Sequence, residues 1–531
     1  MFKNRARVEF DSRSGRIYKF KLLLIIMEYD IIFILGEKYS DHPLCGVALL
    51  KRYLEKNNFS VGVIDIPKNE EEIKKLGKPR LFFGVSSGSI DSMLRNYNAL
   101  KKSRAEDKNV KYTKEIPDRA IIVYSNWIKK HFKDVPIVIG GVESSLRRFT
   151  HYDYWSNSLR RSILLDSRAD ILVYGYGEKQ ILEISKRLAK KENLIGIDGT
   201  CVKDRELPKD SNFVLLPSHE EVSKSKEKFC DMQNLLTSDK NLAQKNDSFY
   251  ILQFKFPEYT SKELDEYYEL PFSRKVFDSN LKGFEFSVVT HRGCIGNCSF
   301  CSLRLMFPSR IVSRSEESIL REIKYLTKLP NFKGNIDDLG GPSANMYWMD
   351  CKKCAGNNCL NCKNLDRTHS KLIHLLKEIR KIKEVKKLFV RSGVRYDLAT
   401  DEYLKELKPH ISGTLKIAPE HVNSDVLELM NKNKGSLEEF MERFRKLGCG
   451  ELSFYFMVGH PGTTMKEARE LADKMKGLKN TKSVQIFTPT PMTDSTCMYY
   501  TGLNPKNKKP IYVPRSYKDK KDQRRVLGSR G

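Results

Sequence analysis

The chain has 531 residues, of which 40% are hydrophobic and 31% charged, and its formal net charge at pH 7 is +28. This length fits about three or four domains, or fewer if one is a barrel. No run of eighteen uninterrupted apolar residues occurs, so we expect no transmembrane helix. The positive charge would attract nucleic acid non-specifically, but lysine is spread through almost every segment. The charge is therefore compatible with two interpretations, a solvated, lysine-rich surface or a nucleic-acid partner.

The first 27 residues contain the apolar run 22–27, which is too short to span a membrane and lacks a signal-peptide cleavage site. We expect residues 1–27 to be an N-terminal extension, or to reflect a start upstream of the true one at Met27. The chain has twelve cysteines, and seven of them lie between Cys294 and Cys362. Without an export signal, this content predicts a cytoplasmic protein that uses cysteine for metal ligation, not for disulfides.

Residues 28–196 alternate short apolar runs with amphipathic helices. This alternation predicts an α/β domain with a doubly wound parallel sheet, whose ligand sites lie at the carboxyl ends of the strands. No GxGxxG follows the first strand, so a dinucleotide site is not supported. The predicted strands lie in the runs 30–36, 60–66, 81–87, 136–141 and 170–177.

The segment 140–155 is dense in arginine and aromatic residues, and it includes Arg147 and Arg148. It could form an anion or nucleobase surface, or the seam on which the next domain packs, and we favour the seam. Residues 197–282 are polar and weakly periodic, so we expect a connector with some helices.

Residues 283–500 contain six successive strand–helix units, which predict a partial, open (β/α)₆ barrel. Residues at strand ends in such barrels face the active site. We therefore expect Arg391, Lys416 and Glu420 to contact cofactor or substrate as catalytic residues, although each could equally anchor a loop. The basic tail 501–531 should be solvated and disordered.

Cys294, Cys298 and Cys301 follow the first barrel strand at CxxxCxxC spacing. A strand that ends in three closely spaced thiols can hold an iron–sulfur cluster. Cubane clusters usually take four cysteines, so one iron would stay open to bind another molecule, as in catalytic metal sites. Structural zinc is the competing interpretation, but zinc prefers four ligands in CxxC pairs.

A second cysteine set lies in the predicted insertion 342–368, after the second barrel strand. Its CxxCxxxxCxxC spacing indicates a four-thiolate site, and chance is a poor explanation for four thiols in twelve residues. The spacing fits structural zinc and an auxiliary iron–sulfur cluster about equally well. The cysteines are Cys351, Cys354, Cys359 and Cys362.

Several strings together resemble the YgiQ-type radical S-adenosylmethionine (SAM) proteins, over roughly residues 28–516. They include FFGVSSGSIDSM, VPIVIGGVESSLRR, DLGGPSANMY, VRSGVRYDL, LKIAPEHV, YFMVGHPGTT and the cluster motif. The resemblance implies a cobalamin-binding-like N-terminal domain, a radical SAM barrel, and a [4Fe–4S] cluster whose open iron binds SAM. It also implies cofactor contacts at Gly340, Gly341 and Gly459, and an electron donor such as flavodoxin or ferredoxin.

Two departures from the family patterns affect these expectations. The corrinoid motif Asp-x-His-x-x-Gly is replaced by SDHPLCG around His42, which argues against cobalamin and favours a local hydrogen-bonding role for this histidine. The usual Gly-Gly-Glu of the second barrel strand ends in Pro342 instead.

The function predicted from these observations is reductive cleavage of SAM to a 5′-deoxyadenosyl radical, which acts on an unknown substrate. One alternative is a corrinoid-dependent methyl or methylthio transferase. The other is a non-catalytic iron–sulfur protein that binds nucleic acid.

Overall fold

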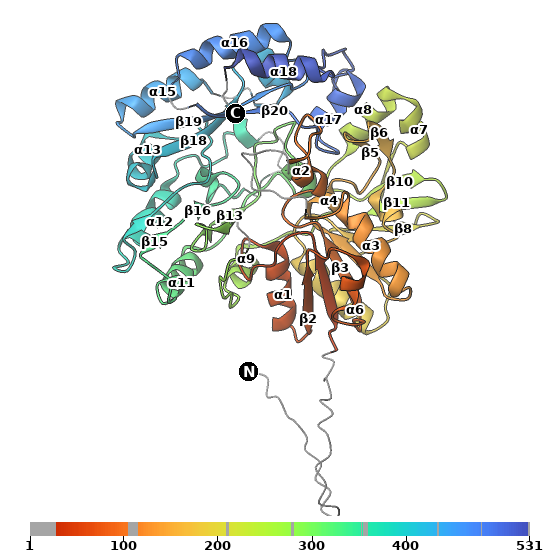
Figure 1. Ribbon diagram of the computed structural model, residues 1–531. Helices are drawn as coiled ribbons and strands as arrows, with labels where there is room; N and C mark the ends of the chain where they lie inside the picture. The colour runs from red at the N-terminus through yellow and green to blue at the C-terminus, as the bar shows by residue number, and fades with distance from the viewer. Residues whose placement is uncertain are drawn as a thin grey trace, which may run out of the picture.

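A computed structural model describes residues 28–104, 115–208, 212–277, 281–351, 353, 359–432, 435–478 and 481–528. The predicted extension at residues 1–27 and Cys354 lie outside this set. Within the described part of the chain, no helix is both long and apolar enough to cross a membrane. Two units lie side by side: an N-terminal unit drawn red to yellow, and a barrel drawn green to blue (Figure 1).

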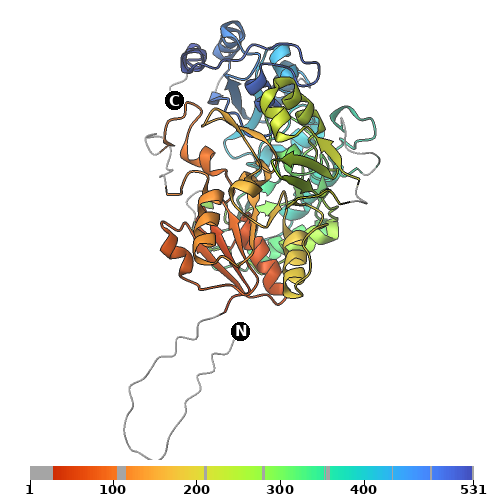
Figure 2. The same cartoon turned by 90° about the vertical axis from the view of Figure 1, so that its right-hand side faces the viewer.

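The N-terminal unit is built on five parallel strands in the order β2-β1-β3-β4-β7. They are β1 (Ile31–Leu35), β2 (Val61–Asp65), β3 (Phe82–Ser86), β4 (Ile137–Gly140) and β7 (Ile171–Val173). Helices α1 (Gly46–Lys56) and α6 (Glu178–Ala189) cover one face, and α3 (Ala120–His131) covers the other (Figure 2). The strands are nearly continuous apolar runs because both faces are buried. The predicted doubly wound parallel sheet is confirmed.

The sheet continues beyond the predicted boundary at residue 196. Residues 200–253, expected as a connector, add four strands in the order β8-β11-β10-β9. The expectation failed because buried amides, such as Gln244 and Gln253, interrupt the apolar pattern of these strands. Gln253 donates to the carbonyls of Thr237 and Lys240 at 2.8 and 3.0 Å. The added strands are β8 (Thr200–Asp204), β9 (Val214–Leu216), β10 (Leu242–Asn246) and β11 (Phe249–Gln253).

The second unit is the predicted partial barrel. Its strand segments pair in parallel as β12 with β16, β15 with β17, β18 with β19 and β19 with β20. They are β12 (Val288–Val289), β15 (Asn335–Ile336), β16 (Leu339–Gly340), β17 (Lys387–Leu388), β18 (Thr414–Glu420), β19 (Glu451–Val458) and β20 (Thr481–Ile486). Outside them lie α11 (Glu316–Leu326), α12 (Ser370–Arg380), α13 (Asp401–Leu407), α15 (Leu437–Lys446) and α16 (Met465–Lys476). The carboxyl ends of these strands therefore meet at one mouth.

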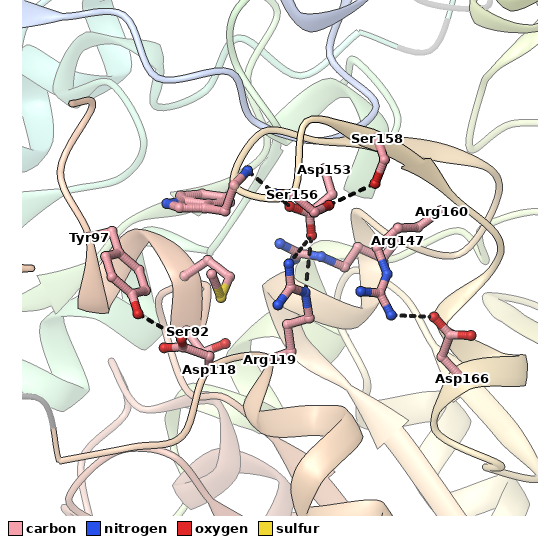
Figure 3. A network of polar contacts seen from close by, with 12 residues as sticks. Ser92, Tyr97, Asp118, Arg119, Arg147, Asp153, Ser156, Ser158, Arg160 and Asp166 are labelled. Carbon is pink, nitrogen blue, oxygen red and sulfur yellow. Dashed lines mark hydrogen bonds and ion pairs between the residues drawn. The ribbon is translucent and has the colours of Figure 1, made fainter. Parts of the chain in front are cut away.

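The arginine- and tyrosine-rich segment 140–155 is a seam, as predicted. Arg147 and Arg148 are 2% and 0% exposed, so neither offers an anion surface. Arg148 donates to the Leu305 carbonyl of the barrel unit at 2.8 Å. Figure 3 shows the neighbouring network, in which Asp153 accepts from Arg119 at 2.9 Å.

The C-terminal residues form the helix α18 (Tyr517–Val526) where we expected a solvated tail. This helix is strongly polar, and it is held by two buried polar side chains. Lys520 donates to the hydroxyls of Tyr154 and Tyr499 at 2.9 and 3.0 Å, and burial lowers the pKa of Lys520 to about 8. Gln523 accepts from the Gly459 amide at 2.9 Å. The expectation failed because the sequence of this helix has no apolar pattern that would predict its packing against the rest of the protein.

Burial lowers the pKa values of six histidines from 6.5 to about 3 or 4, which predicts acid lability. They are His42, His151, His291, His369, His421 and His460. Between pH 6.5 and about 4 the unfolded chain binds protons that the native state excludes. The free energy of unfolding should therefore decrease as the pH is lowered through this range, by up to about 1.4 kcal/mol per pH unit for each histidine.

Urea unfolding at pH 7.5, 6.0 and 5.0 measures this dependence. His421→Gln should reduce the number of protons taken up on unfolding, which sets the slope of the unfolding free energy against pH, by about one. His374→Gln, at a side chain 57% exposed, should leave this slope unchanged. A midpoint that stays constant across this range would contradict the prediction.

Candidate metal and SAM site

The cysteine loop leaves the short strand β13 (His291–Arg292) through Gly293 and ends at helix α10 (Leu303–Met306). Gly293 has a φ of 88°, and a Cβ there would lie 1.8 Å from the Arg310 carbonyl oxygen. Only glycine combines this backbone conformation with such a close approach. The residue thus fixes the direction in which the loop enters the barrel mouth.

Contacts from distant segments hold the loop over the mouth. The Ser299 amide donates to the Met430 carbonyl at 2.9 Å, and the Ser495 amide donates to the Ser299 carbonyl at 3.0 Å. Asn431 Nδ2 donates to the Asn297 carbonyl at 2.7 Å. The loop is therefore tied to the segments that follow β18 and β20.

Two of the three thiols of the loop, those of Cys294 and Cys301, are largely removed from water. Burial raises the pKa of Cys294, and it raises the pKa of Cys301 to about 12. A thiol in such a place is protonated at neutral pH unless a cation takes the proton's position, because desolvation penalises the bare thiolate. The Gly296 amide donates to Cys294 Sγ at 3.3 Å, the kind of hydrogen bond that a metal-bound thiolate accepts. This donor set fits a metal centre.

The spacing of the sulfurs favours a cluster over zinc. A tetrahedral zinc site with Zn–S bonds of about 2.3 Å places its sulfurs about 3.8 Å apart. The sulfur atoms of Cys294, Cys298 and Cys301 do not all lie within 4.8 Å of one another. At least one pair of these sulfurs is thus farther apart than a shared zinc ion allows. Three thiols from one short loop can hold a [4Fe–4S] cluster with one open iron, so the residues present fit that cluster.

Two cations flank the cysteines. Arg395 Nη1 lies 3.8 Å from Cys298 Sγ, and the Arg395 side chain is held by an ion pair with Asp397 at 2.5 Å. Lys432 Nζ pairs with Glu420 at 2.9 Å and lies 5.8 Å from the Phe300 ring centroid. Positive charge at this position stabilises the negative charge of a thiolate-ligated cluster.

The three predicted catalytic residues have different surroundings. Glu420 is close to the cysteine loop through Lys432, and its φ of 69° is uncommon for a residue other than glycine. Arg391 donates to the Gly283 carbonyl at 3.0 Å and lies 5.0 Å from the Phe389 ring centroid. The Lys416 side chain is exposed on β18. Sequence reasoning missed Arg395, which lies four residues after Arg391 and contacts the cluster thiol.

The predicted glycines occupy two strand tips. Gly340 ends β16 and Gly341 follows it, and a Cβ on Gly341 would lie 2.6 Å from the His291 ring. Ser392 and Asp338 lie beside them, and the Asp338 carboxylate accepts the Arg391 amide at 2.7 Å and the Ser392 amide at 3.1 Å. Gly459 follows β19, where α18 covers it.

The second cysteine set packs beside the first. Cys359 belongs to a small apolar cluster with Ile295, and Cys294 and Cys362 pack against the same cluster. Cys351 is half-buried, and Cys354 lies outside the described residues.

Comparisons with known proteins place the chain in a family. A UPF0313 protein of Methanocaldococcus jannaschii is 45% identical, over 94% of this chain and 89% of its own length. One from Clostridium botulinum is 42% identical, over 94% of this chain and 85% of its own length. The chain belongs to the UPF0313 family. The YgiQ-type resemblance is thus confirmed.

Two family models match this UPF0313 member: Radical SAM N-terminal over residues 24–285, and Radical SAM superfamily over residues 288–475. The second match includes all three cysteines of the loop. This UPF0313 protein is therefore an enzyme of the radical SAM class.

A solved structure shares the fold of the UPF0313 chain. It is the radical SAM methyltransferase TsrM of Kitasatospora setae, with cobalamin and a [4Fe–4S] cluster bound. The TM-score is 0.53 at 15% identity, and the alignment covers 88% of this chain and 74% of TsrM. The arrangement of a parallel-sheet domain before a radical SAM barrel is thus shared.

His42 does not fit a histidine-ligated corrinoid in this UPF0313 protein. Its side chain is 0% exposed. Its Nε2 lies 3.0 Å from the Glu285 carbonyl oxygen, and its Nδ1 accepts from the Leu44 amide at 3.1 Å. Both ring nitrogens are engaged, so the predicted local hydrogen-bonding role is confirmed.

Two cavities adjoin between the units of the UPF0313 protein. One, of about 260 Å³, lies beside Gly340 and Gly341 in the barrel. The other, of about 300 Å³, lies at the carboxyl ends of the N-terminal strands. They share four lining residues, which are Leu44, Tyr176, Tyr268 and Arg292.

Proposed function

We propose that this enzyme binds a [4Fe–4S] cluster at Cys294, Cys298 and Cys301, and that it cleaves SAM reductively to act on a substrate held between its two units. The observation that carries the proposal is the loop of three half-buried thiols at the barrel mouth, within the residues that match the radical SAM model. When bound, the cluster supplies one electron that splits SAM into methionine and a 5′-deoxyadenosyl radical.

The chain's own residues position the cofactors and exclude water. Gly340 and Gly341 line the barrel cavity, and we propose that their backbone contacts the methionine end of SAM there. A side chain on Gly341 would collide with the His291 ring, so this position requires glycine. Arg395 supplies positive charge at the cysteines, and the Lys432–Glu420 pair borders them. We retain Glu420, Lys416 and Arg391 as proposed substrate or SAM contacts, with Glu420 the best placed. Gly459 is a proposed cofactor contact at the β19 tip.

We also propose that Cys351, Cys354, Cys359 and Cys362 hold a second metal, either zinc or an iron–sulfur cluster. The support is their paired CxxC spacing and the packing of Cys359 and Cys362 beside the first cysteine loop. A zinc and iron count of anaerobically purified protein distinguishes the two. If the count showed no zinc, and no iron beyond the four atoms of one [4Fe–4S] cluster per chain, the second site would be contradicted.

The corrinoid-dependent transferase is not favoured, because His42 is engaged on both nitrogens. Anaerobic purification with and without hydroxocobalamin tests this directly. We expect no corrinoid to remain with the protein after gel filtration, and 5′-deoxyadenosine to form from SAM under dithionite in both preparations. Absence of 5′-deoxyadenosine from iron-replete protein would contradict the proposed function. An electron donor such as flavodoxin or ferredoxin should replace dithionite.

Arg395→Gln should make the cluster harder to reduce. Removing a cation 3.8 Å from a ligand sulfur destabilises the added electron, and a lowering of the midpoint potential by about 50 mV or more follows at an effective dielectric constant near 20. An EPR-monitored redox titration measures it. Arg321→Gln, at an exposed arginine paired with Glu269, is the control and should leave the potential unchanged. An unchanged potential in Arg395→Gln would refute the assigned role.

A further inference from the structure

Arg292 lies where the two cavities meet, and three of its contacts fix the side chain. Nε donates to the Tyr268 hydroxyl at 3.0 Å, and Nη2 pairs with Glu178 at 2.8 Å. The guanidinium carbon lies 4.3 Å from the Tyr176 ring centroid. The guanidinium is therefore held in one orientation before any ligand arrives.

One nitrogen of this guanidinium is left over. Nη1 is buried and has no hydrogen-bond partner among the described residues, and Arg292 as a whole is 6% exposed. Buried polar groups in native proteins nearly always have a partner, so an exception calls for an explanation. Because Arg292 lines both cavities, an acceptor atom of a bound molecule can supply the missing partner.

The walls of the larger cavity define what such a molecule is like. They are mostly aliphatic and aromatic, with glycines at the strand tips, and 300 Å³ is at the lower end of the range for drug-sized ligands. The charged residues in the lining are Glu37, Glu178 and Arg292. The Arg292 guanidinium is already paired with Glu178, so its positive charge is balanced before a ligand arrives, which disfavours an anionic ligand.

We infer that the paired cavities bind an uncharged, largely apolar molecule that presents a hydrogen-bond acceptor, such as a carbonyl oxygen, to Nη1 of Arg292. The inference rests on the proposed function, in which this molecule is the substrate. It reaches from the N-terminal sheet into the barrel cavity beside Gly341. The N-terminal unit then serves as a substrate-binding domain.

Three naphthalene probes of similar size test the inference by fluorescence titration of the cluster-loaded protein. They are 2-acetylnaphthalene, which has a carbonyl acceptor, 2-ethylnaphthalene, which has none, and 2-naphthoate, which is an anion. We expect the ketone to bind at least tenfold more tightly than either of the others. Equal affinities, no binding, or tightest binding of the anion would overturn the inference.

Two variants locate the binding. Arg292→Met combined with Glu178→Gln removes both charges of the buried pair, so no unpaired charge remains. It should abolish the tenfold preference for the ketone while the hydrocarbon still binds. Gly46 lies at the cavity mouth, where a Cβ would meet nothing within 4 Å, so Gly46→Trp should block all three probes. Gly477→Trp, at the end of α16, is the matched control and should bind like wild type.

A separate readout distinguishes this inference from the proposed function. The formation of 5′-deoxyadenosine is measured in wild type and in Gly477→Trp without any probe, and it should be equal because Gly477 lines neither cavity and lies outside the cluster loop. SAM cleavage without ketone preference would refute the inference alone. Ketone preference without SAM cleavage in iron-replete protein would refute the proposed function alone. Displacement of the ketone by stoichiometric hydroxocobalamin would show a corrinoid site and overturn the inference.

Discussion

Cys298→Ala should abolish both cluster assembly and SAM cleavage. With two thiols left in the loop, the cluster loses one of its three protein ligands. Anaerobically reconstituted iron at the first site should fall from about four atoms per chain to near zero. The rate of 5′-deoxyadenosine formation should fall at least about 1,000-fold, as expected when the group that performs the chemistry is lost.

Cys449→Ala is the matched control for this variant. Cys449 is also a buried thiol of the barrel unit, 3% exposed, but it packs in the barrel core and donates to the Leu404 carbonyl at 3.5 Å. It precedes β19, at the end of that strand opposite to the barrel mouth. The variant should keep its iron and its activity. If Cys298→Ala retained wild-type yields of 5′-deoxyadenosine, the assignment of this cysteine would be wrong.

Gly293→Ala should disrupt the loop without removing a ligand. The new Cβ would lie 1.8 Å from a backbone oxygen, so either the loop or the segment around Arg310 must move. We expect a loss of more than about 3 kcal/mol in the free energy of unfolding, and cluster occupancy below half of wild type. Urea unfolding of the apo-protein and an iron count measure the two effects.

Gly413→Ala separates the collision from the backbone strain. Gly413 has a φ of 79°, similar to Gly293, but a Cβ there would meet nothing within 4 Å. It should lose only about 1 kcal/mol, the cost of placing alanine in the left-handed region. Equal losses in the two variants would show that the approach to Arg310 does not matter.

The strands of both units were predictable because their cores are apolar in sequence. All five parallel strands of the N-terminal sheet lie in the expected runs, and the barrel strands follow in the expected order. The cysteine site was predictable because the CxxxCxxC spacing by itself indicates ligation of an iron–sulfur cluster. Ligand residues within eight positions need no long-range information to be brought together.

The rest depended on polar contacts that a single sequence does not reveal. Residues 200–253 extend the sheet by pairing β8 with β7 and carry buried amides such as Gln253, and α18 docks through Lys520. Arg391 and Arg395 both lie in the segment that follows β17, and a single sequence does not show that Arg395 is the one that contacts Cys298. The unpartnered nitrogen of Arg292 becomes visible only when both units are in place.

The central claim is that three thiols hold a cluster with one iron open to SAM. The most direct measurement is the EPR spectrum of the dithionite-reduced, reconstituted protein, recorded before and after SAM is added. We predict a [4Fe–4S]⁺ signal whose g-values change on addition of SAM, because SAM binds the open iron. A protein that binds no iron, or a cluster signal that SAM leaves unchanged, would contradict the account.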